Sequence, residues 1–141
     1  MIFNVIKYCF FFYIVVFLLA MTANNINIPS NEVLEMPLPL PYNGEIYSEN
    51  DVEEFLNKTI KQSKQPIIIF GGNWCPDCRI LDGTLQLPTI KKYMNRYYRI
   101  MHVDVGRYDK NMSLISYFNI PKEEGVPRVL VFDKNKNILN M

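Results

Sequence analysis

Three short apolar runs divide the chain after residue 60, at 67–70, 100–105 and 129–132. The first run is continuous and rich in isoleucine, which is typical of a strand buried on both faces of a sheet. Gly71 and Gly72 follow it and permit a tight turn. The other two runs predict two further strands. The polar stretch 133–137 predicts a hairpin turn into a last strand at 138–139.

Apolar residues at helical spacing fill the intervals between these runs. The predicted helices cover 51–60, from Cys75 to about 81, 89–97 and 112–118, and a short first strand is expected at 45–47. Gly83 is expected to interrupt the second helix, and Pro88 suits the first position of the third. This order predicts an α/β fold, in which helices flank a central mixed sheet with parallel pairing and an antiparallel hairpin at its end.

The start of the chain predicts a leader over residues 1–23. Lys7 precedes an apolar run, and no charge follows until Glu32. The run has the length of a secretory signal peptide, and the alternative is an uncleaved membrane anchor over 2–21. In both cases the positive flank stays in the cytoplasm, so we expect an exported protein in the periplasm or another extracytoplasmic space. Residues 24–47, rich in Pro and Asn, are expected to form a linker, a tether or loosely packed arm.

Composition narrows the function. Hydrophobic residues make up 49% and charged residues 21%, with a net charge of +1, which suits one globular domain and gives no reason to expect nucleic acid as a partner. The chain has three cysteines and one histidine, His102. Cys9 lies in the leader, and the other two form one C-x-x-C pair, Cys75 and Cys78. This supply is poor for a four-ligand zinc site or a disulfide framework, so we expect a redox-active pair and no metal.

The pair sits where a helix is predicted to begin. Two cysteines three apart at that point share one face, at a separation that suits a reversible disulfide. Pro76 at the first helical position needs no hydrogen-bond donor. The N-terminus of a helix favours the thiolate, so Cys75 should attack and Cys78 should resolve the mixed disulfide. A permanent structural bridge is the alternative, although so small a loop constrains little chain.

Two neighbours of the pair are expected to tune it in opposite directions. Asp77 disfavours a thiolate at Cys75 and would make the reduced protein a stronger reductant, whereas Arg79 would do the reverse. The sequence leaves open which effect is larger.

Two segments resemble thioredoxins: 67–79, with Trp74-Cys75-Pro76-Asp77-Cys78, and 125–133, with Gly125-Val126-Pro127. The loop is most similar to that of exported bacterial thioredoxin-like proteins. The resemblance implies that Cys75 is the nucleophile and Cys78 the resolving thiol. It further implies that Trp74 is a flat surface beside the disulfide, that Pro127 is a cis-proline holding a substrate strand, and that Val126 offers that strand backbone hydrogen bonds.

The chain departs from the family in two places. Many reducing thioredoxins carry a buried acid six residues before the first cysteine, where this chain has Ile69. The closing helix of the family is missing after Met141, so we expect the domain, 48–141, to be truncated at its C-terminus, with a less stable complete domain as the alternative. His102, between apolar neighbours, is interpreted as a structural histidine.

These observations predict a thiol–disulfide oxidoreductase that exchanges disulfides with protein thiols, as a reductase or isomerase rather than an oxidase. No cofactor beyond the Cys75–Cys78 disulfide is expected, and a membrane electron donor would keep the pair reduced. Two alternatives stay open. One is an exported thioredoxin-fold binding or chaperone module, and the other is a thiol donor in metal or haem assembly.

Overall fold

A computed structural model describes residues 25–121 and 125–141, and the predicted leader at 1–23 lies outside these ranges. Three strands, β1 (Gln65–Gly71), β2 (Tyr98–Asp104) and β3 (Arg128–Val131), form one sheet in the order β2-β1-β3. β1 runs parallel to β2 and antiparallel to β3. The predicted mixed sheet is therefore confirmed, with the isoleucine run as its central strand. Among the helices in the described ranges, none combines the length and apolar character needed to cross a bilayer.

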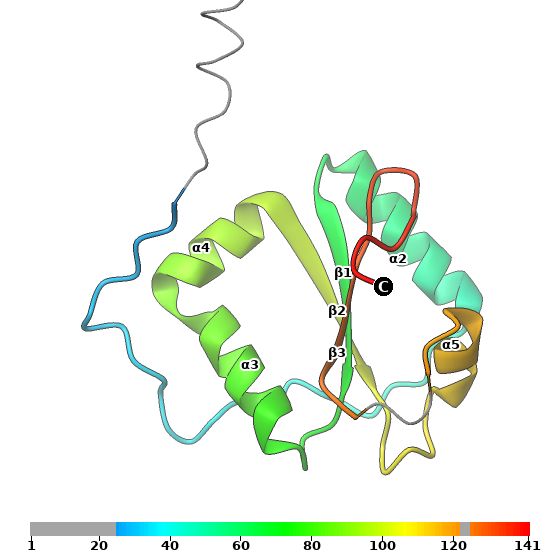
Figure 1. Cartoon of the computed structure of the whole chain (residues 1–141), viewed down its shortest axis with the longest axis horizontal. Coiled ribbons are helices and arrows are strands. Elements are labelled where there is room, and N and C mark those ends of the chain that lie inside the picture. The colour runs from blue at the N-terminus through cyan, green and yellow to red at the C-terminus, as the bar shows by residue number, and fades with distance from the viewer. Residues whose placement is uncertain (1–24, 122–124) are drawn as a thin grey trace, which may run out of the picture.

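Helices cover both faces of the sheet (Figure 1). α3 (Pro76–Gln86) and α4 (Pro88–Tyr97) lie on one side, and α2 (Glu49–Lys61) and α5 (Met112–Tyr117) lie on the other. α2 begins with a capping box, in which Ser48 and Asp51 each accept a backbone N–H of the other. On its face of the sheet, side chains of α2 and α5 bury the main core. This core includes Val52, Leu56, Ile68, Phe70, Leu114 and Phe132.

The prediction that Gly83 would interrupt the second helix is wrong. α3 continues through Gly83 to Gln86. A Cβ atom at residue 83 would lie 3.3 Å from methyl groups of both Leu34 and Leu38. Gly83 is thus the place where the N-terminal segment packs closely against the helix, and this contact offsets the low helix propensity of glycine.

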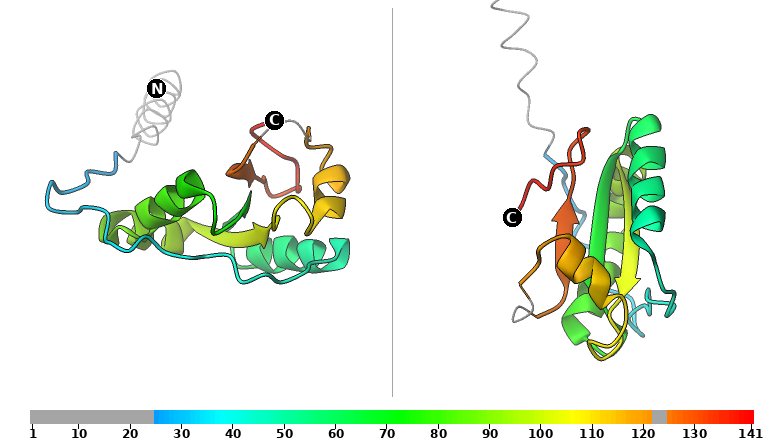
Figure 2. Two further views of the ribbon diagram at one scale, coloured as in Figure 1. Left: turned by 90° about the horizontal axis from the view of Figure 1, so that it is seen from below. Right: turned by 90° about the vertical axis from the view of Figure 1, so that its right-hand side faces the viewer.

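The N-terminal segment 25–47 is mostly exposed, but it follows a fixed course along the domain, past α4 and α3 to α2 (Figure 2). Glu32 accepts hydrogen bonds from the backbone and hydroxyl of Thr89 in α4. Arg79 of α3 donates to the carbonyl of Leu38 at 2.7 Å. The expected tether is therefore a docked arm, and we call residues 25–47 the N-terminal arm. The short strand expected at 45–47 is absent from it.

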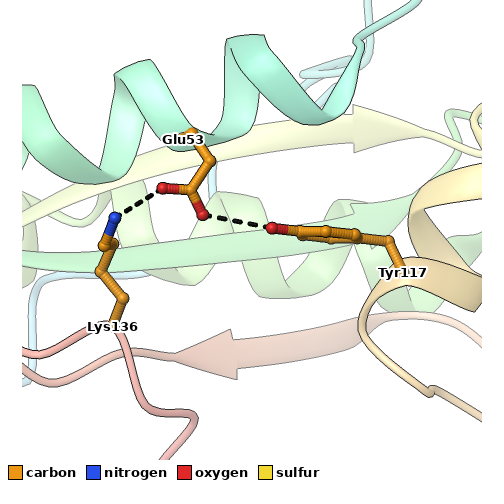
Figure 3. A network of polar contacts seen from close by, with 3 residues as sticks. All are labelled: Glu53, Tyr117 and Lys136. Atoms are coloured by element: carbon orange, nitrogen blue, oxygen red, sulfur yellow. Dashed lines mark hydrogen bonds and ion pairs between the residues drawn. The ribbon is translucent and has the colours of Figure 1, made fainter.

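The C-terminal turn is also tied to the helices. Phe132 and Ile138 form a single antiparallel bridge, and the backbone N–H of Leu139 donates to the Val131 carbonyl, in place of a full hairpin strand. Glu53 of α2 accepts hydrogen bonds from Lys136 in the turn, at 2.6 Å, and from Tyr117 of α5, at 3.2 Å (Figure 3). The end of the chain is thereby held against the α2 and α5 face.

Candidate active site

The end of β1 forces the two cysteines into the first turn of α3. After Gly71 the chain turns, and the backbone N–H of Cys75 donates to the Gly72 carbonyl at 3.0 Å. Cys75 is the N-cap of α3, and Pro76 is at the first helical position, as predicted. The Cys75 sulfur accepts a hydrogen bond from the backbone N–H of Cys78 at 3.3 Å. A sulfur in this position receives the same N–H that an N-cap oxygen would, and negative charge on it is favoured there.

Both cysteines are free thiols, and both are buried, Cys75 with 5% of its surface exposed and Cys78 with 1%. The Cys75 thiol donates to the backbone carbonyl of Val126 at 3.5 Å. The Val126–Pro127 peptide bond is cis, as the resemblance implied. The structure thus places the predicted substrate loop directly beside the predicted nucleophile.

Cys78 lies deeper and is enclosed by the N-terminal arm. Tyr42 of the arm has 4% of its surface exposed and packs with the two cysteines in a small second core. Its hydroxyl is in hydrogen-bonding contact with the Cys78 thiol. Burial, together with the neighbouring Cys75 sulfur, raises the pKa of Cys78 to about 12. Cys78 therefore keeps its proton at neutral pH.

A reciprocal pair of hydrogen bonds fixes Tyr42. The Asn73 side chain accepts from the Tyr42 backbone N–H at 3.1 Å and donates to its carbonyl at 2.7 Å. A Cβ atom at Gly71 would lie 2.2 Å from the Tyr42 hydroxyl oxygen and 2.8 Å from the Cys78 sulfur. Gly71 is thus required for space, because these two atoms converge where a side chain would begin.

Trp74 forms the rim of the site, with 37% of its surface exposed. Its indole N–H donates to the Gly106 carbonyl. Tyr108 contacts the ring edge-on, with centroids 5.9 Å apart, and the Arg107 guanidinium lies 4.7 Å from the ring centroid. These contacts hold the indole as a flat, partly exposed surface next to Cys75, which agrees with the expected position of Trp74.

The three residues expected to tune the pair have separate positions. Pro76 and Asp77 are exposed on the first turn of α3. Arg79 points to the N-terminal arm, where its guanidinium donates to the carbonyls of Leu38 and Pro39 at 2.7 and 3.2 Å. Arg79 thus directs its N–H donors to the arm, and the expected opposition of Asp77 and Arg79 at Cys75 stays a prediction.

Two buried polar residues near the thiols are not predicted by the sequence: Tyr42, which falls in the expected linker, and Asp82. The interpretation of the half-buried His102 as a structural histidine stays a prediction. Asp82 has 4% of its surface exposed, and its Oδ1 atom lies 3.0 Å from Nε2 of His102, off the line of a regular hydrogen bond. The signal for Asp82 was its spacing, since a residue four positions after Cys78 shares its helix face.

In residues 25–121 and 125–141, no three His, Cys, Asp or Glu side chains gather as metal ligands would. The site instead presents two thiols on one helical turn beside a cis-proline loop. This fold and pair define the class of the protein as a thiol–disulfide oxidoreductase.

Comparison with known proteins agrees with that class. A sequence model of the thioredoxin-like family matches residues 46–134, and the chain belongs to this family. Among solved structures, the chain is similar to a disulphide isomerase from Xylella fastidiosa Temecula1. The TM-score is 0.64 and the sequence identity 28%, over 72% of this chain and 78% of that one. A search of curated proteins returned no match.

Proposed function

We propose that this protein exchanges disulfides with protein substrates, as a reductase or isomerase. The observation that carries the proposal is the position of the Cys75 sulfur, which receives the Cys78 backbone N–H at 3.3 Å and lies 3.5 Å from the Val126 carbonyl. The first contact stabilises a thiolate at the start of the helix. The second places that thiolate beside backbone to which an extended substrate can add as a strand.

The reaction has two displacements. The Cys75 thiolate attacks one sulfur of the substrate disulfide, the substrate S–S bond breaks, and the other substrate sulfur leaves as a thiolate and takes a proton. Cys78 then loses its proton and attacks the Cys75 sulfur, which forms the Cys75–Cys78 disulfide and releases the second substrate thiol. Two electrons pass from the pair to the substrate. An external dithiol reduces the Cys75–Cys78 disulfide again in reductase turnover. In an isomerase cycle, a different pair of substrate thiols reduces it, so the two electrons return to the pair and a new substrate disulfide forms.

The buried resolving thiol adds nothing to an oxidising potential of the pair. A strongly oxidising pair gains its potential from a reduced state that is stabilised as thiolate. Burial raises the pKa of Cys78 to about 12, so this thiol contributes no such stabilisation. The similarity to a disulphide isomerase supports the same range of activities.

Three cysteine variants of the full chain test the proposal with an insulin-reduction assay and a scrambled-disulfide substrate. Cys75→Ser should lose activity, and Cys78→Ser should accumulate mixed disulfides that non-reducing gels and mass spectrometry identify. Cys9→Ser is the matched control, because it removes a cysteine outside the pair. Full activity of both Cys75→Ser and Cys78→Ser would exclude thiol exchange and favour a binding module.

We also propose that the protein works outside the cytoplasm, with residues 1–23 as a signal peptide or membrane anchor and a membrane protein as electron donor. The support is the apolar leader after Lys7. Fusion of the leader to a reporter enzyme that is active only after export tests this. A reporter retained in the cytoplasm would contradict it.

A further inference from the structure

The second displacement needs an acceptor for the Cys78 proton. In many reducing thioredoxins that role falls to an acid on the central strand, but here the position is Ile69, which is apolar and 2% exposed. Since the Cys78 pKa is about 12, spontaneous loss of the proton at neutral pH is slow. The described side chains around Cys78 must therefore supply another acceptor if exchange is to be fast.

Tyr42 is the polar side chain in contact with Cys78. Its hydroxyl meets the thiol, and its ring lies edge-on to the His102 ring, with centroids 5.4 Å apart. Burial and the adjacent Cys78 sulfur raise the pKa of Tyr42 well above its ordinary value, so the phenol does not ionise. A neutral phenol can accept one proton while it gives up its own, and can therefore act as a relay.

A buried carboxylate, that of Asp82, lies near Tyr42 and next to His102. Asp82 stands one helical turn after Cys78 on the same face of α3, and its charge is close enough to Tyr42 to contribute to the raised pKa of that phenol. His102 is the register partner of Ile69 in the parallel pairing of β1 and β2, so it lies one strand away from the missing acid, on the same face of the sheet.

The Asp82–His102 pair also reaches solvent. Both residues line an open cavity of about 360 Å³ between α3, α4 and β2. The charged groups that share this cavity are Lys64, Lys91 and Arg99. A proton held by the pair can leave through this cavity without crossing the substrate-binding side of the site.

We propose that Tyr42 and the Asp82–His102 pair take up the proton that Cys78 loses when it resolves the mixed disulfide, an inference that rests on the proposed function. The Cys78 proton moves to the Tyr42 oxygen while the phenolic proton passes to the pair, directly or across one water molecule. The Cys78 sulfur then forms its bond to Cys75, and the bond from Cys75 to the substrate sulfur breaks. The pair returns the proton to solvent through the cavity.

The test separates the two displacements with a symmetrical aromatic disulfide, which releases one chromophoric thiolate when Cys75 attacks and a second when Cys78 resolves. Tyr42→Phe keeps the ring and its backbone contacts but removes the relay. We expect the first phase at the rate of the unmodified protein and the second about 100-fold slower at pH 7, in the range usual for loss of acid–base catalysis. Tyr47→Phe is the control, because that hydroxyl of the same arm contacts Glu45 and no thiol.

Asp82→Asn should slow the second phase similarly, and the double variant Tyr42→Phe/Asp82→Asn should be no slower than the slower single variant, since groups in series do not add. In these variants the rate of the second phase should rise about tenfold per pH unit, because hydroxide then removes the Cys78 proton in place of the relay. A normal second phase in Tyr42→Phe, or multiplying effects in the double variant, would overturn the relay. If the unmodified protein shows neither phase, the proposed function itself fails.

Discussion

The contact between Tyr42 and Cys78 depends on the absence of a side chain at Gly71. In Gly71→Ala, the new methyl carbon would stand 2.2 Å from the Tyr42 hydroxyl oxygen, 2.5 Å from its Cζ atom and 2.8 Å from the Cys78 sulfur. The hydroxyl oxygen and the sulfur end their side chains, but both side chains are buried. The Tyr42 backbone is bound to Asn73, and Cys78 is fixed in α3. The ring must therefore move out of its site, or β1 must shift away from α3.

Overpacking of a buried site by one methyl group costs about 1–3 kcal/mol. For a domain of this size, each kcal/mol lowers the melting temperature by roughly 4–8 °C. We therefore expect Gly71→Ala to melt several degrees lower than the unmodified protein, and to show a slower second displacement because the Tyr42 hydroxyl has left the thiol. Tyr42→Phe should not rescue it, since the Cζ atom at 2.5 Å remains.

Thermal unfolding of the reduced proteins, followed by circular dichroism, measures the effect. Gly125→Ala is the matched control, because a Cβ atom there meets nothing within 4 Å, and its stability should stay within about 0.5 kcal/mol of the unmodified protein. If Gly71→Ala proved as stable as Gly125→Ala and resolved mixed disulfides at the normal rate, the packing of Tyr42 on Cys78 would be refuted.

Two further predictions concern the arm and the pH dependence of stability. Arg79→Gln removes the hydrogen bonds to Leu38 and Pro39, so limited proteolysis should cut the arm faster than in the unmodified protein; an unchanged cleavage rate would contradict this. The folded state raises the Cys78 pKa to about 12. The contribution of Cys78 to the free energy of unfolding of the reduced protein should therefore be complete below about pH 8.5 and disappear as the pH rises towards 12. Urea unfolding at a series of pH values should show a smaller alkaline loss in Cys78→Ser, and an equal loss would contradict the assignment.

The sheet and the thiol pair could be predicted because their signals are local. An uninterrupted apolar run before two glycines predicts a buried strand and a turn, and a cysteine before Pro76 predicts a helix start. The extent of α3 could not be predicted, because the groups that accommodate Gly83 belong to the N-terminal arm, more than 40 residues earlier. The contact of Tyr42 with Cys78 could not be predicted for the same reason, since neither the spacing of Tyr42 nor its neighbours in sequence relate it to Cys78.

The N-terminal arm packs with the thioredoxin-like domain at its thiol pair, although the family match begins after Tyr42. The family model begins at residue 46, yet Tyr42 is buried together with Cys75 and Cys78. Desolvation is the largest cause of the raised Cys78 pKa, and the Tyr42 ring supplies one wall of that enclosure. Arg79, the residue after Cys78 in α3, anchors the same arm by donating to the backbone carbonyls of Leu38 and Pro39. The surroundings of the resolving thiol therefore come from two segments at once, and Tyr42 of the N-terminal arm is part of the active site.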